Sequence, residues 1–331
     1  MKKVTKILGI GLLVIIACIL GILAYVSFAL PDVGPPPNIE IEQTAERVER
    51  GKHLANNVMV CMHCHTPIDK AKFAHPLKVD SLGAGGVYFG PEEGLPGVFY
   101  SPNITPAALG DWTDGEIYRA ITSGVNKDGR ALFPIMPHPN YGKIEKEDIY
   151  SIIAYLRTLE PIENKIPEQE ISFPMNFIIN TIPKPAEHTL VRDTTDPIKW
   201  GEYLVTAGSC SDCHSPREKG AIIPGMEFAG GAEFPLIDGS IVRTSNITPD
   251  EITGIGRWTE TDFIKRFKDY ADSSFNFARV ADDQFNTAMP WQNYSKMSEE
   301  ELKAIYAYLQ TVKPVENEVK RFTSVLESDS E

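Results

Sequence analysis

The sequence predicts an all-α protein in which two loop-rich domains in tandem follow a single transmembrane helix. Three observations lead to this prediction: an uncharged apolar run at the N-terminus, an imperfect internal repeat with a spacing of about 150 residues, and an amphipathic helical pattern at the end of each copy. With 331 residues, the chain is also longer than one ordinary domain.

Residues 1–30 are expected to form a membrane anchor. No charged residue occurs from Ile7 to Leu30, and a helix of about 20 apolar residues is long enough to span a bilayer. Lys2, Lys3 and Lys6 precede this run, and positive charge favours the cytoplasmic side. The rest of the chain is therefore expected outside the cytoplasm.

Two other fates of this segment stay open. Ser27-Phe28-Ala29 resembles the small-residue site at which a signal peptide is removed, although the apolar region of a signal peptide usually has only about 7 to 15 residues. Cys18 could accept a lipid, but the apolar run continues well beyond it, which favours a cysteine buried in the membrane. Both alternatives also lead to export.

Residues 31–41 are expected to form a stiff linker. Pro31, Pro35, Pro36 and Pro37 cannot continue a helix, and a proline-rich stretch of this kind is extended. The linker would hold the folded part away from the membrane.

The repeat divides the remaining chain into a first domain at 42–160, a connector at 161–196, a second domain at 197–315 and a C-terminal tail at 316–331. Five landmarks recur in the same order, which indicates duplication of a whole domain. They are Arg50-Gly51-Lys52-His53-Leu54 with Trp200-Gly201-Glu202-Tyr203-Leu204, Pro102-Asn103-Ile104-Thr105 with Ser245-Asn246-Ile247-Thr248, Trp112-Thr113 with Trp258-Thr259, Met136-Pro137 with Met289-Pro290, and Ala154-Tyr155-Leu156 with Ala307-Tyr308-Leu309.

Each copy is expected to begin and end with a helix. At the ends, apolar residues recur at i, i+3, i+4 and i+7, the spacing of one helix face. Between the ends the sequence is rich in Gly, Pro, Asn and Ser, which predicts loops, and no segment alternates long enough to predict a sheet. The apolar positions are Ile149, Ile152, Ile153 and Leu156 in the first copy, and Leu302, Ile305, Tyr306 and Leu309 in the second.

The connector is expected to pack against one of the domains. It contains several prolines, yet it also carries the apolar residues Ile171, Phe173, Met175, Phe177 and Ile178. A loop-rich domain of roughly 110 residues is itself short of core, so something large and apolar should fill the centre of each copy.

Each copy carries the pattern C-x-x-C-H after its first helix. Two thiols at this spacing reach the two vinyl groups of a porphyrin, and the adjacent His then lies beneath the iron. The pattern therefore predicts covalent haem c at Cys61 and Cys64 with His65 as axial ligand, and a second haem c at Cys210 and Cys213 with His214 as axial ligand.

A structural zinc site and a redox-active disulfide are the alternatives for these cysteines. Closed zinc sites usually draw their ligands from one compact unit, whereas the two C-x-x-C pairs head separate copies about 150 residues apart. Neither alternative explains why a His follows both pairs.

A second axial ligand should approach each iron from a later loop. Met136 and Met289 stand at equivalent places before each final helix, and the flanking prolines stiffen the loop that would hold a weak thioether ligand. His138 competes with Met136 in the first copy. His53, His63, His75 and His188 have no counterpart in the second copy and are expected to be surface or structural residues.

Four further repeated residues are weaker candidates for the haem environment. Asn103 and Asn246 could donate hydrogen bonds to the haem edge or to a ligand loop, with turn formation as the alternative. Trp112 and Trp258 could contact propionates through the indole N–H, with packing at the start of a helix as the alternative.

These motifs resemble those of class I c-type cytochromes, and the Asn-Ile-Thr, Trp-Thr, Met-Pro and Ala-Tyr-Leu elements are similar to those of the cytochrome c subunits of bacterial membrane-bound alcohol, aldehyde and gluconate dehydrogenases. The resemblance covers residues from about Glu42 to Val312. It implies two tandem class I cytochrome c domains, each a small all-α domain around one His/Met haem. Those subunits usually carry three haem domains, whereas this chain carries two and a long connector.

The predicted function is electron transfer by a di-haem cytochrome without catalytic residues, because six-coordinate iron leaves no open position for oxygen or peroxide. The expected partners are a dehydrogenase or quinol-oxidising complex on one side and a terminal oxidase or soluble cytochrome on the other, with the haem domains in the periplasm at the bacterial cytoplasmic membrane. The net charge of −13 disfavours nucleic acid as a partner. A di-haem peroxidase and a permanent haem subunit of a dehydrogenase complex remain as alternatives.

Overall fold

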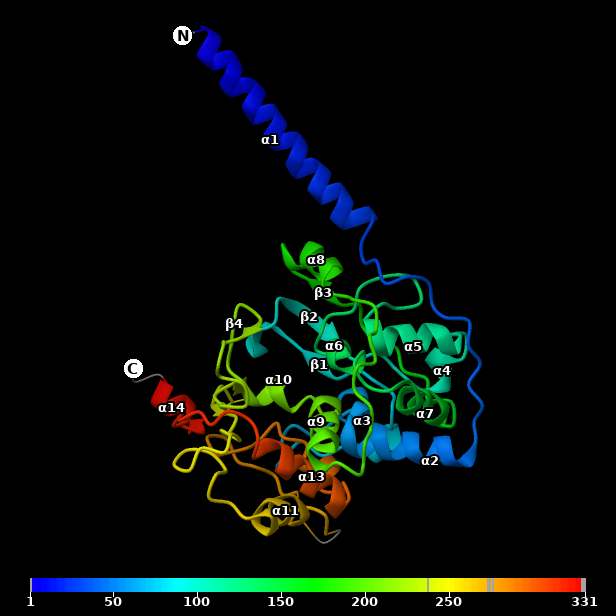
Figure 1. Ribbon diagram of the computed structural model, residues 1–331, viewed down its shortest axis with the longest axis vertical. Coiled ribbons are helices and arrows are strands. Elements are labelled where there is room, and N and C mark those ends of the chain that lie inside the picture. The colour runs from blue at the N-terminus through cyan, green and yellow to red at the C-terminus, as the bar shows by residue number, and fades with distance from the viewer. Residues whose placement is uncertain (1, 237, 273–274, 276, 329–331) are drawn as a thin grey trace.

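The computed structural model describes residues 2–236, 238–272, 275 and 277–328. Its first element is α1 (Lys2–Phe28), which stands apart from the globular part of the chain (Figure 1). From Lys3 on, the side chains of this helix are exposed except that of Val26, which is half-buried. The helix is long and apolar enough to cross a membrane, although a signal sequence passes the same test.

The N-terminal half, residues 42–171, is built on two long helices joined by short ones. Its helices are α2 (Ala45–His53), which continues as a π-helical turn (Leu54–Val58), α3 (Cys61–His65), α4 (Pro106–Leu109), α5 (Asp114–Ser123), α6 (His138–Tyr141) and α7 (Lys146–Leu156). In the C-terminal half, residues 197–328, the counterparts of α2, α3, α5, α6 and α7 are, in order, α9 (Pro197–Ala207), α10 (Cys210–His214), α11 (Glu260–Lys268), α12 (Trp291–Tyr294) and α13 (Glu299–Leu309), and α14 (Val325–Ser328) follows them.

The predicted helices at the start and end of each copy are confirmed, and they pack on each other in pairs. In α2, a Cβ added to Gly51 would lie 1.8 Å from the carbonyl oxygen of Ser151 in α7. In α9, a Cβ added to Gly201 would lie 2.0 Å from the carbonyl oxygen of Ala304 in α13. Both pairs therefore cross with backbone against backbone, which only glycine permits at this distance.

The apolar stripes of the closing helices form the core, as their spacing predicted. Ile149, Ile152, Ile153 and Leu156 are all buried in α7, and Leu302, Ile305 and Leu309 are buried in α13. These residues belong to one cluster that runs through both halves.

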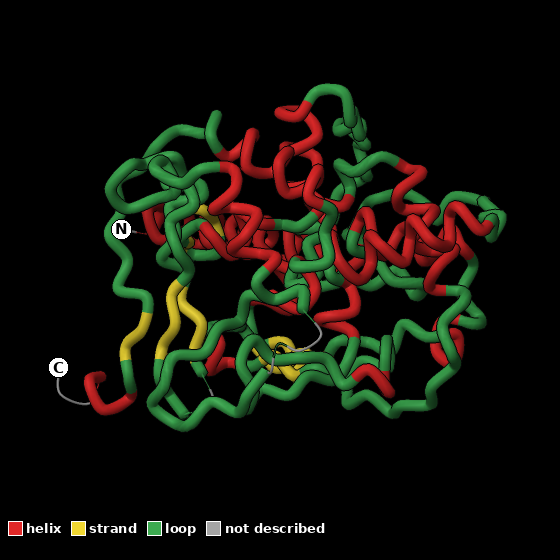
Figure 2. The backbone as a smooth tube through the Cα atoms, turned by 90° about the horizontal axis from the view of Figure 1, so that it is seen from below, coloured by secondary structure: helices red, strands yellow, loops and turns green. Residues whose placement is uncertain are grey.

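The expectation of a fold without sheets is wrong in detail, because three short antiparallel sheets join the loops (Figure 2). Strands of two to four residues show no alternation that could predict them. The sheets are β1 (Tyr88–Phe89), β2 (Gly97–Tyr100) and β3 (Glu170–Ile171) in the N-terminal half, and β4 (Arg217–Glu218) with β5 (Ala221–Ile222) and β6 (Glu233–Pro235), β7 (Ile241–Arg243) and β8 (Phe322–Thr323) in the C-terminal half.

Strands β3 and β8 show that the repeat extends beyond the predicted domain ends. β3 lies in the predicted connector and pairs with β2, and β8 lies in the predicted tail and pairs with β7. Upstream of these strands, Asn164 and Asn317 each donate a 2.9 Å hydrogen bond, to the carbonyl oxygens of Ala84 and Ala229 respectively. The start of the connector and the tail are therefore the same part of the duplicated unit.

The connector packs in part against the N-terminal half, as its apolar residues predicted, since Leu190 lies against the core and the N–H of His188 donates to the carbonyl oxygen of Gly142 at 2.8 Å. Ile171 belongs to β3, but Phe173 is 79% exposed and Ile178 is 44% exposed. The helix α8 (Met175–Ile178) and the 3-10 turn that follows it (Ile179–Thr181) contact the end of α1 rather than the core of a domain (Figure 1).

Candidate functional site

The two C-x-x-C-H motifs adopt the same local structure. α3 and α10 are helices of five residues, and each is preceded by a residue in the left-handed region, Val60 with φ of 45° and Ser209 with φ of 51°. Residues three apart in a helix lie on the same face, so both cysteines of each motif point to one side. All four thiols are free of disulfides.

The environment of these thiols is unlike that of a redox-active pair. Burial raises the pKa of Cys61, Cys210 and Cys213 to about 12 and that of Cys64 to about 11. Reactive C-x-x-C cysteines have a lowered pKa instead. Among the residues that the structure describes, no group of three or more His, Cys, Asp or Glu side chains is arranged to hold a metal ion such as zinc.

His65 and His214 are held in the same tautomer. The Nδ1 atom of His65 lies 2.8 Å from the carbonyl oxygen of Pro102, and that of His214 lies 2.8 Å from the carbonyl oxygen of Ser245. A carbonyl only accepts hydrogen bonds, so each Nδ1 carries the proton and each Nε2 keeps its lone pair. Burial lowers the pKa of both imidazoles, which favours this neutral form.

This arrangement fits a haem iron. A His ligand binds iron through the lone pair of one ring nitrogen, while the other nitrogen donates to a carbonyl that orients the ring. In the described part of the chain, no hydrogen bond reaches Nε2 of His65 or of His214. Each Nε2 is thus free to act as an axial ligand beside two cysteines that face the same way.

The two candidate methionines lie in matching turns. The N–H of His138 donates to the carbonyl oxygen of Met136 at 2.7 Å, and the N–H of Trp291 donates to that of Met289 at 2.8 Å. Both methionine side chains are half-buried against the core. The turns lead into α6 and α12.

A tyrosine that the sequence analysis did not assign ties each methionine turn to the C-x-x-C-H motif of the same half. Tyr141 donates to the carbonyl oxygen of Met59 at 3.1 Å, and Tyr294 donates to that of Gly208 at 2.9 Å. Met59 and Gly208 each stand two residues before the first cysteine of the motif. The repeated spacing Met-Pro-x-x-x-Tyr is the signal that could have revealed these residues.

His138, the competing ligand in the first copy, is deeply buried. Its ring packs against Gly124, where an added Cβ would meet Cδ2 and Nε2 at 2.5 Å. Burial lowers its pKa to about 4, and its Nε2 has no hydrogen-bond partner in the described residues. Trp291 takes the matching place in the second copy and stacks on Tyr270 with ring centroids 4.8 Å apart.

Asn103 and Asn246 make the contacts of turn residues. The Oδ1 of each accepts from the backbone and the hydroxyl of the Thr two residues later, and the Nδ2 of each donates a 2.7 Å hydrogen bond to the segment that follows the closing helix. These acceptors are the carbonyl oxygens of Ile162 and Val315. The sequences Pro161-Ile162-Glu163-Asn164 and Pro314-Val315-Glu316-Asn317 are the repeated signal for this contact, which the sequence analysis missed.

Trp112 and Trp258 stand directly before helix starts. Thr113 and Thr259 cap α5 and α11 through capping boxes with Glu116 and Asp262. The indole of Trp112 lies under the ammonium of Lys127, and that of Trp258 is 37% exposed. Their positions match the alternative of packing at a helix start.

The structure also brings the two motifs together across the boundary between the halves. Asn140 donates to Asp212 within the second motif at 3.0 Å, while Asn293 lies beside His63 within the first motif. An added Cβ at Gly208, two residues before the second motif, would lie 3.3 Å from the carbonyl oxygen of Val58, three residues before the first motif. The sequence could not indicate this proximity, because it arises from packing between the copies.

The C-terminal half is similar in sequence to known cytochromes c. Residues 198–313 match the family model described as cytochrome c, so the chain carries a cytochrome c domain. Such a domain implies covalently bound haem c.

The chain is similar to several cytochrome subunits. It is 28% identical over 285 residues to the alcohol dehydrogenase (quinone) cytochrome c subunit of Gluconacetobacter polyoxogenes, covering 81% of this chain and 56% of the relative. It is 28% identical over 318 residues to the gluconate 2-dehydrogenase cytochrome c subunit of Pantoea cypripedii, covering 90% and 64%. It is 26% identical over 234 residues to a diheme cytochrome c-type protein of Cereibacter sphaeroides, covering 66% and 73%. The chain spans little more than half of the length of the alcohol dehydrogenase subunit.

Proposed function

We propose that the chain is a di-haem electron-transfer protein, with tandem cytochrome c domains at 42–160 and 197–315 anchored to a membrane by residues 1–30. The observation that carries this proposal is the duplicated geometry: each half has an Nδ1-protonated His after two free cysteines, and a methionine turn tied to the same motif by a Tyr. The second copy is also the one that matches the cytochrome c family model.

The proposed roles of the residues follow from this geometry. A haem bound at each site would supply a one-electron iron couple. The carbonyl oxygens of Pro102 and Ser245 fix the ring orientation of the proximal histidines, and the Tyr contacts hold the methionine turns. The covalent attachment residues are Cys61, Cys64, Cys210 and Cys213, and the axial pairs are His65 with Met136 and His214 with Met289.

We place the protein in the periplasm, where it takes electrons from a dehydrogenase or a quinol-oxidising complex and passes them toward a terminal oxidase or a soluble cytochrome. The names of the relatives, which are cytochrome subunits of dehydrogenases, support a dehydrogenase as donor and a lasting place in such a complex. Copurification of a flavin- or quinone-containing subunit with the full chain tests this assignment.

Haem counting and ligand replacement test the central proposal. The alkaline pyridine spectrum of the purified protein should give two haem c per chain, and a value near zero would overturn the proposal. Met136→Ala and Met289→Ala should each remove the methionine-to-iron charge-transfer band of one ferric haem, while Met226→Ala, which changes a methionine outside both sites, should leave the spectrum unchanged. A high-spin haem in the unmodified protein together with peroxide turnover would favour the peroxidase alternative.

A further inference from the structure

The connector contains an apolar segment whose Phe173 and Ile178 side chains are left exposed by the described part of the chain. From Ile171 to Pro183 there is no charged residue, in a protein whose net charge is −13. Within this segment Phe173 is 79% exposed and Ile178 is 44% exposed, and the rings of Phe173 and Phe177 contact each other edge to face with centroids 6.1 Å apart. Exposed apolar residues gathered in this way mark a contact with a protein or a membrane.

The segment is fixed to the end of the transmembrane helix. Asn180 donates from Nδ2 to the carbonyl oxygen of Val26 at 3.4 Å, and this carbonyl is one of the last four in α1, which have no partner within the helix. Ile179 is 4% exposed beside this contact. α8 is therefore held at the level of Val26.

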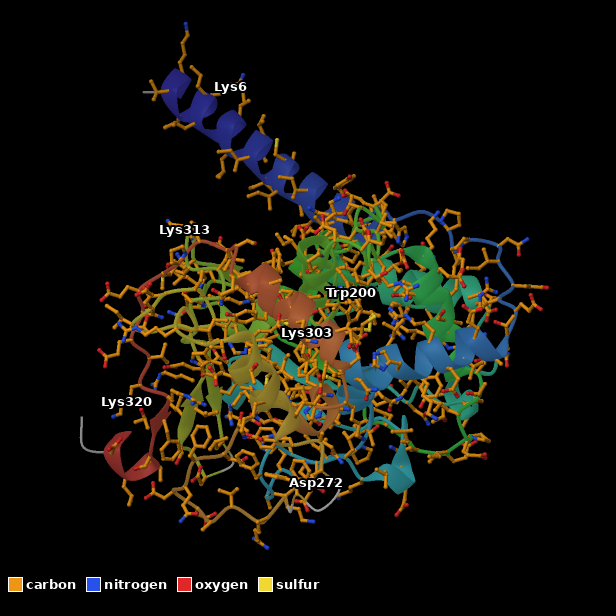
Figure 3. The ribbon with its side chains drawn as sticks, turned by 60° about the horizontal axis from the view of Figure 1, so that its bottom comes forward. Lys6, Trp200, Asp272, Lys303, Lys313 and Lys320 are labelled. Atoms are coloured by element: carbon orange, nitrogen blue, oxygen red, sulfur yellow. The ribbon has the colours of Figure 1, made fainter. Side chains whose placement is uncertain are left out.

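That level coincides with the outer boundary of a bilayer. The uncharged part of α1 begins at Ile7, and the stretch from Ile7 to Val26 rises by about 30 Å, which is the thickness of the hydrocarbon core. Lys6, the last charged residue before this stretch, lies at the end of the stretch that points away from the globular part (Figure 3). A membrane that accommodates α1 thus reaches the apolar segment as well.

The duplication provides a comparison within the chain. α14 follows β8 in the C-terminal half as α8 follows β3 in the N-terminal half. α14 also carries an exposed apolar side chain, Leu326, at 71% exposure, but it is acidic at Glu327 and lies far from α1 (Figure 1). The apolar character is therefore special to the copy of this helix that lies beside the anchor.

We infer that residues 171–183 form a second membrane contact, in which Phe173, Phe177 and Ile178 insert into the lipid interface beside α1. This inference rests on the proposed membrane anchor. Two contacts, one spanning and one interfacial, limit the tilt of the globular part and hold the N-terminal half next to the bilayer. Aromatic and apolar side chains favour this interfacial region.

Photolabelling of the complete haem-loaded chain in lipid nanodiscs tests the inference. Discs of phosphatidylethanolamine and phosphatidylglycerol would contain a phospholipid with a diazirine group, and labelled peptides would be identified by mass spectrometry. We expect label in α1 and in residues 171–183, but not in the peptide that carries Leu326. The double variant Phe173→Ser with Ile178→Ser should lose the label in 171–183 and keep it in α1, and Leu326→Ser should change neither.

The outcomes separate this inference from the proposed anchor. Label in α1 without label in 171–183 overturns the second contact and leaves the anchor intact, and it would direct attention to a protein partner for α8. Absence of the protein from the discs overturns the anchor and the inference together. Because the exchanged side chains are exposed, an unchanged haem spectrum in each variant would show that the fold is retained.

Discussion

Arg321 is a charged residue whose field reaches the proposed proximal ligand of the C-terminal half. Burial lowers the pKa of His214, the hydrogen bond to Ser245 opposes this, and the positive charge of Arg321 lowers the pKa further. Burial and the charge of Arg266 lower the pKa of Arg321 itself. Among the described residues, no carboxylate lies within ion-pairing distance of Arg321. Asn164 and Asn317 correspond in the two halves and are 153 residues apart. By the same offset, the residue of the N-terminal half that corresponds to Arg321 is Glu168. The two proposed haems therefore lie in different electrostatic surroundings.

Replacing Arg321 should lower the reduction potential of one haem. Positive charge near the iron favours the ferrous form, so Arg321→Gln should lower the potential of the haem held by His214, by roughly 1 kcal/mol or about 40 mV for a screened charge. A spectroelectrochemical titration would show one of two waves move. Arg130→Gln, which removes an exposed arginine paired with Asp128, should leave both waves in place. Equal movement of both waves in Arg321→Gln would contradict the assignment.

The tyrosine ties offer a second test at the level of single atoms. Tyr141 is buried and donates to the carbonyl oxygen of Met59, so Tyr141→Phe removes one buried hydrogen bond and should lower the free energy of unfolding by about 1 kcal/mol. Because the tie also holds the methionine turn, imidazole should displace the methionine from the ferric iron more readily in this variant. Denaturant unfolding and ligand titration measure the two effects. Tyr88→Phe, in which an exposed bond to Glu92 is lost, is the matched control.

At the scale of elements, the crossings of the first and last helices depend on one glycine each. The closest approach is in the N-terminal half, where a Cβ at Gly51 would lie 1.8 Å from the carbonyl oxygen of Ser151. Gly51→Ala should separate α2 from α7 and destabilise the holoprotein by about 1–3 kcal/mol, the usual cost of overpacking. Thermal unfolding would measure the loss. Lys52→Ala, at the next and exposed position of α2, should change the midpoint little.

Helices were predictable from the sequence because their signal is local. The stripe from Ile149 to Leu156 predicts a helix by spacing alone, and burial of the same residues confirms it. The short strands were not predictable, since β3 is two residues long and owes its existence to β2, more than 70 positions earlier in the chain. Phe173 and Ile178 contributed to the expectation that the connector packs against a domain, yet both are exposed, because hydropathy records that a residue avoids water and not which surface covers it.

In the candidate site, too, features with a local sequence signal were predictable and contacts between distant parts of the chain were not. The C-x-x-C-H motifs and the methionine turns stand out because they are short and repeated, and their roles as haem ligands remain predictions. The partners of the histidines could not be read from the sequence, because Pro102 and Ser245 lie 37 and 31 residues beyond them. Their carbonyl oxygens reach the rings only after the loops have folded back onto the motifs.

At the scale of the whole molecule, the two halves exchange equivalent contacts. His53 stands two residues after Gly51, and Tyr203 stands two residues after Gly201. Each contacts an acidic residue near the start of the closing helix of the other half. Tyr203 donates to Asp148 at 2.7 Å, and Nε2 of His53 lies 2.9 Å from Glu301. Arg50 binds Asp148 at 2.7 Å and lies 3.9 Å from Glu301. The halves are thus joined with approximate two-fold symmetry through a partly buried polar network.

This network should make the stability of the molecule depend on pH on the acid side. Burial by itself raises the pKa of Glu301, but the hydrogen bond and charge of His53, the N–H of Ser298 and the charge of Arg50 together lower it below its ordinary 4.5. The folded chain therefore binds this proton less tightly than the unfolded chain. The stabilisation from Glu301 is complete above pH 4.5 and is lost as the pH falls through the lower pKa of the folded state.

Glu301→Gln keeps the shape and the capping role of the side chain but removes its charge, so it should lower the free energy of unfolding near neutral pH by about 1.5–3 kcal/mol, the range for hydrogen bonds to charged groups. In this variant, the free energy of unfolding should also fall less steeply with decreasing pH below pH 4.5. Urea unfolding of the holoprotein at a series of pH values measures both effects. Glu299→Gln removes an exposed charge from the same first turn of α13 and should keep the acid dependence of the unmodified chain. If Glu301→Gln retained that dependence as well, the network between the halves would not be its source.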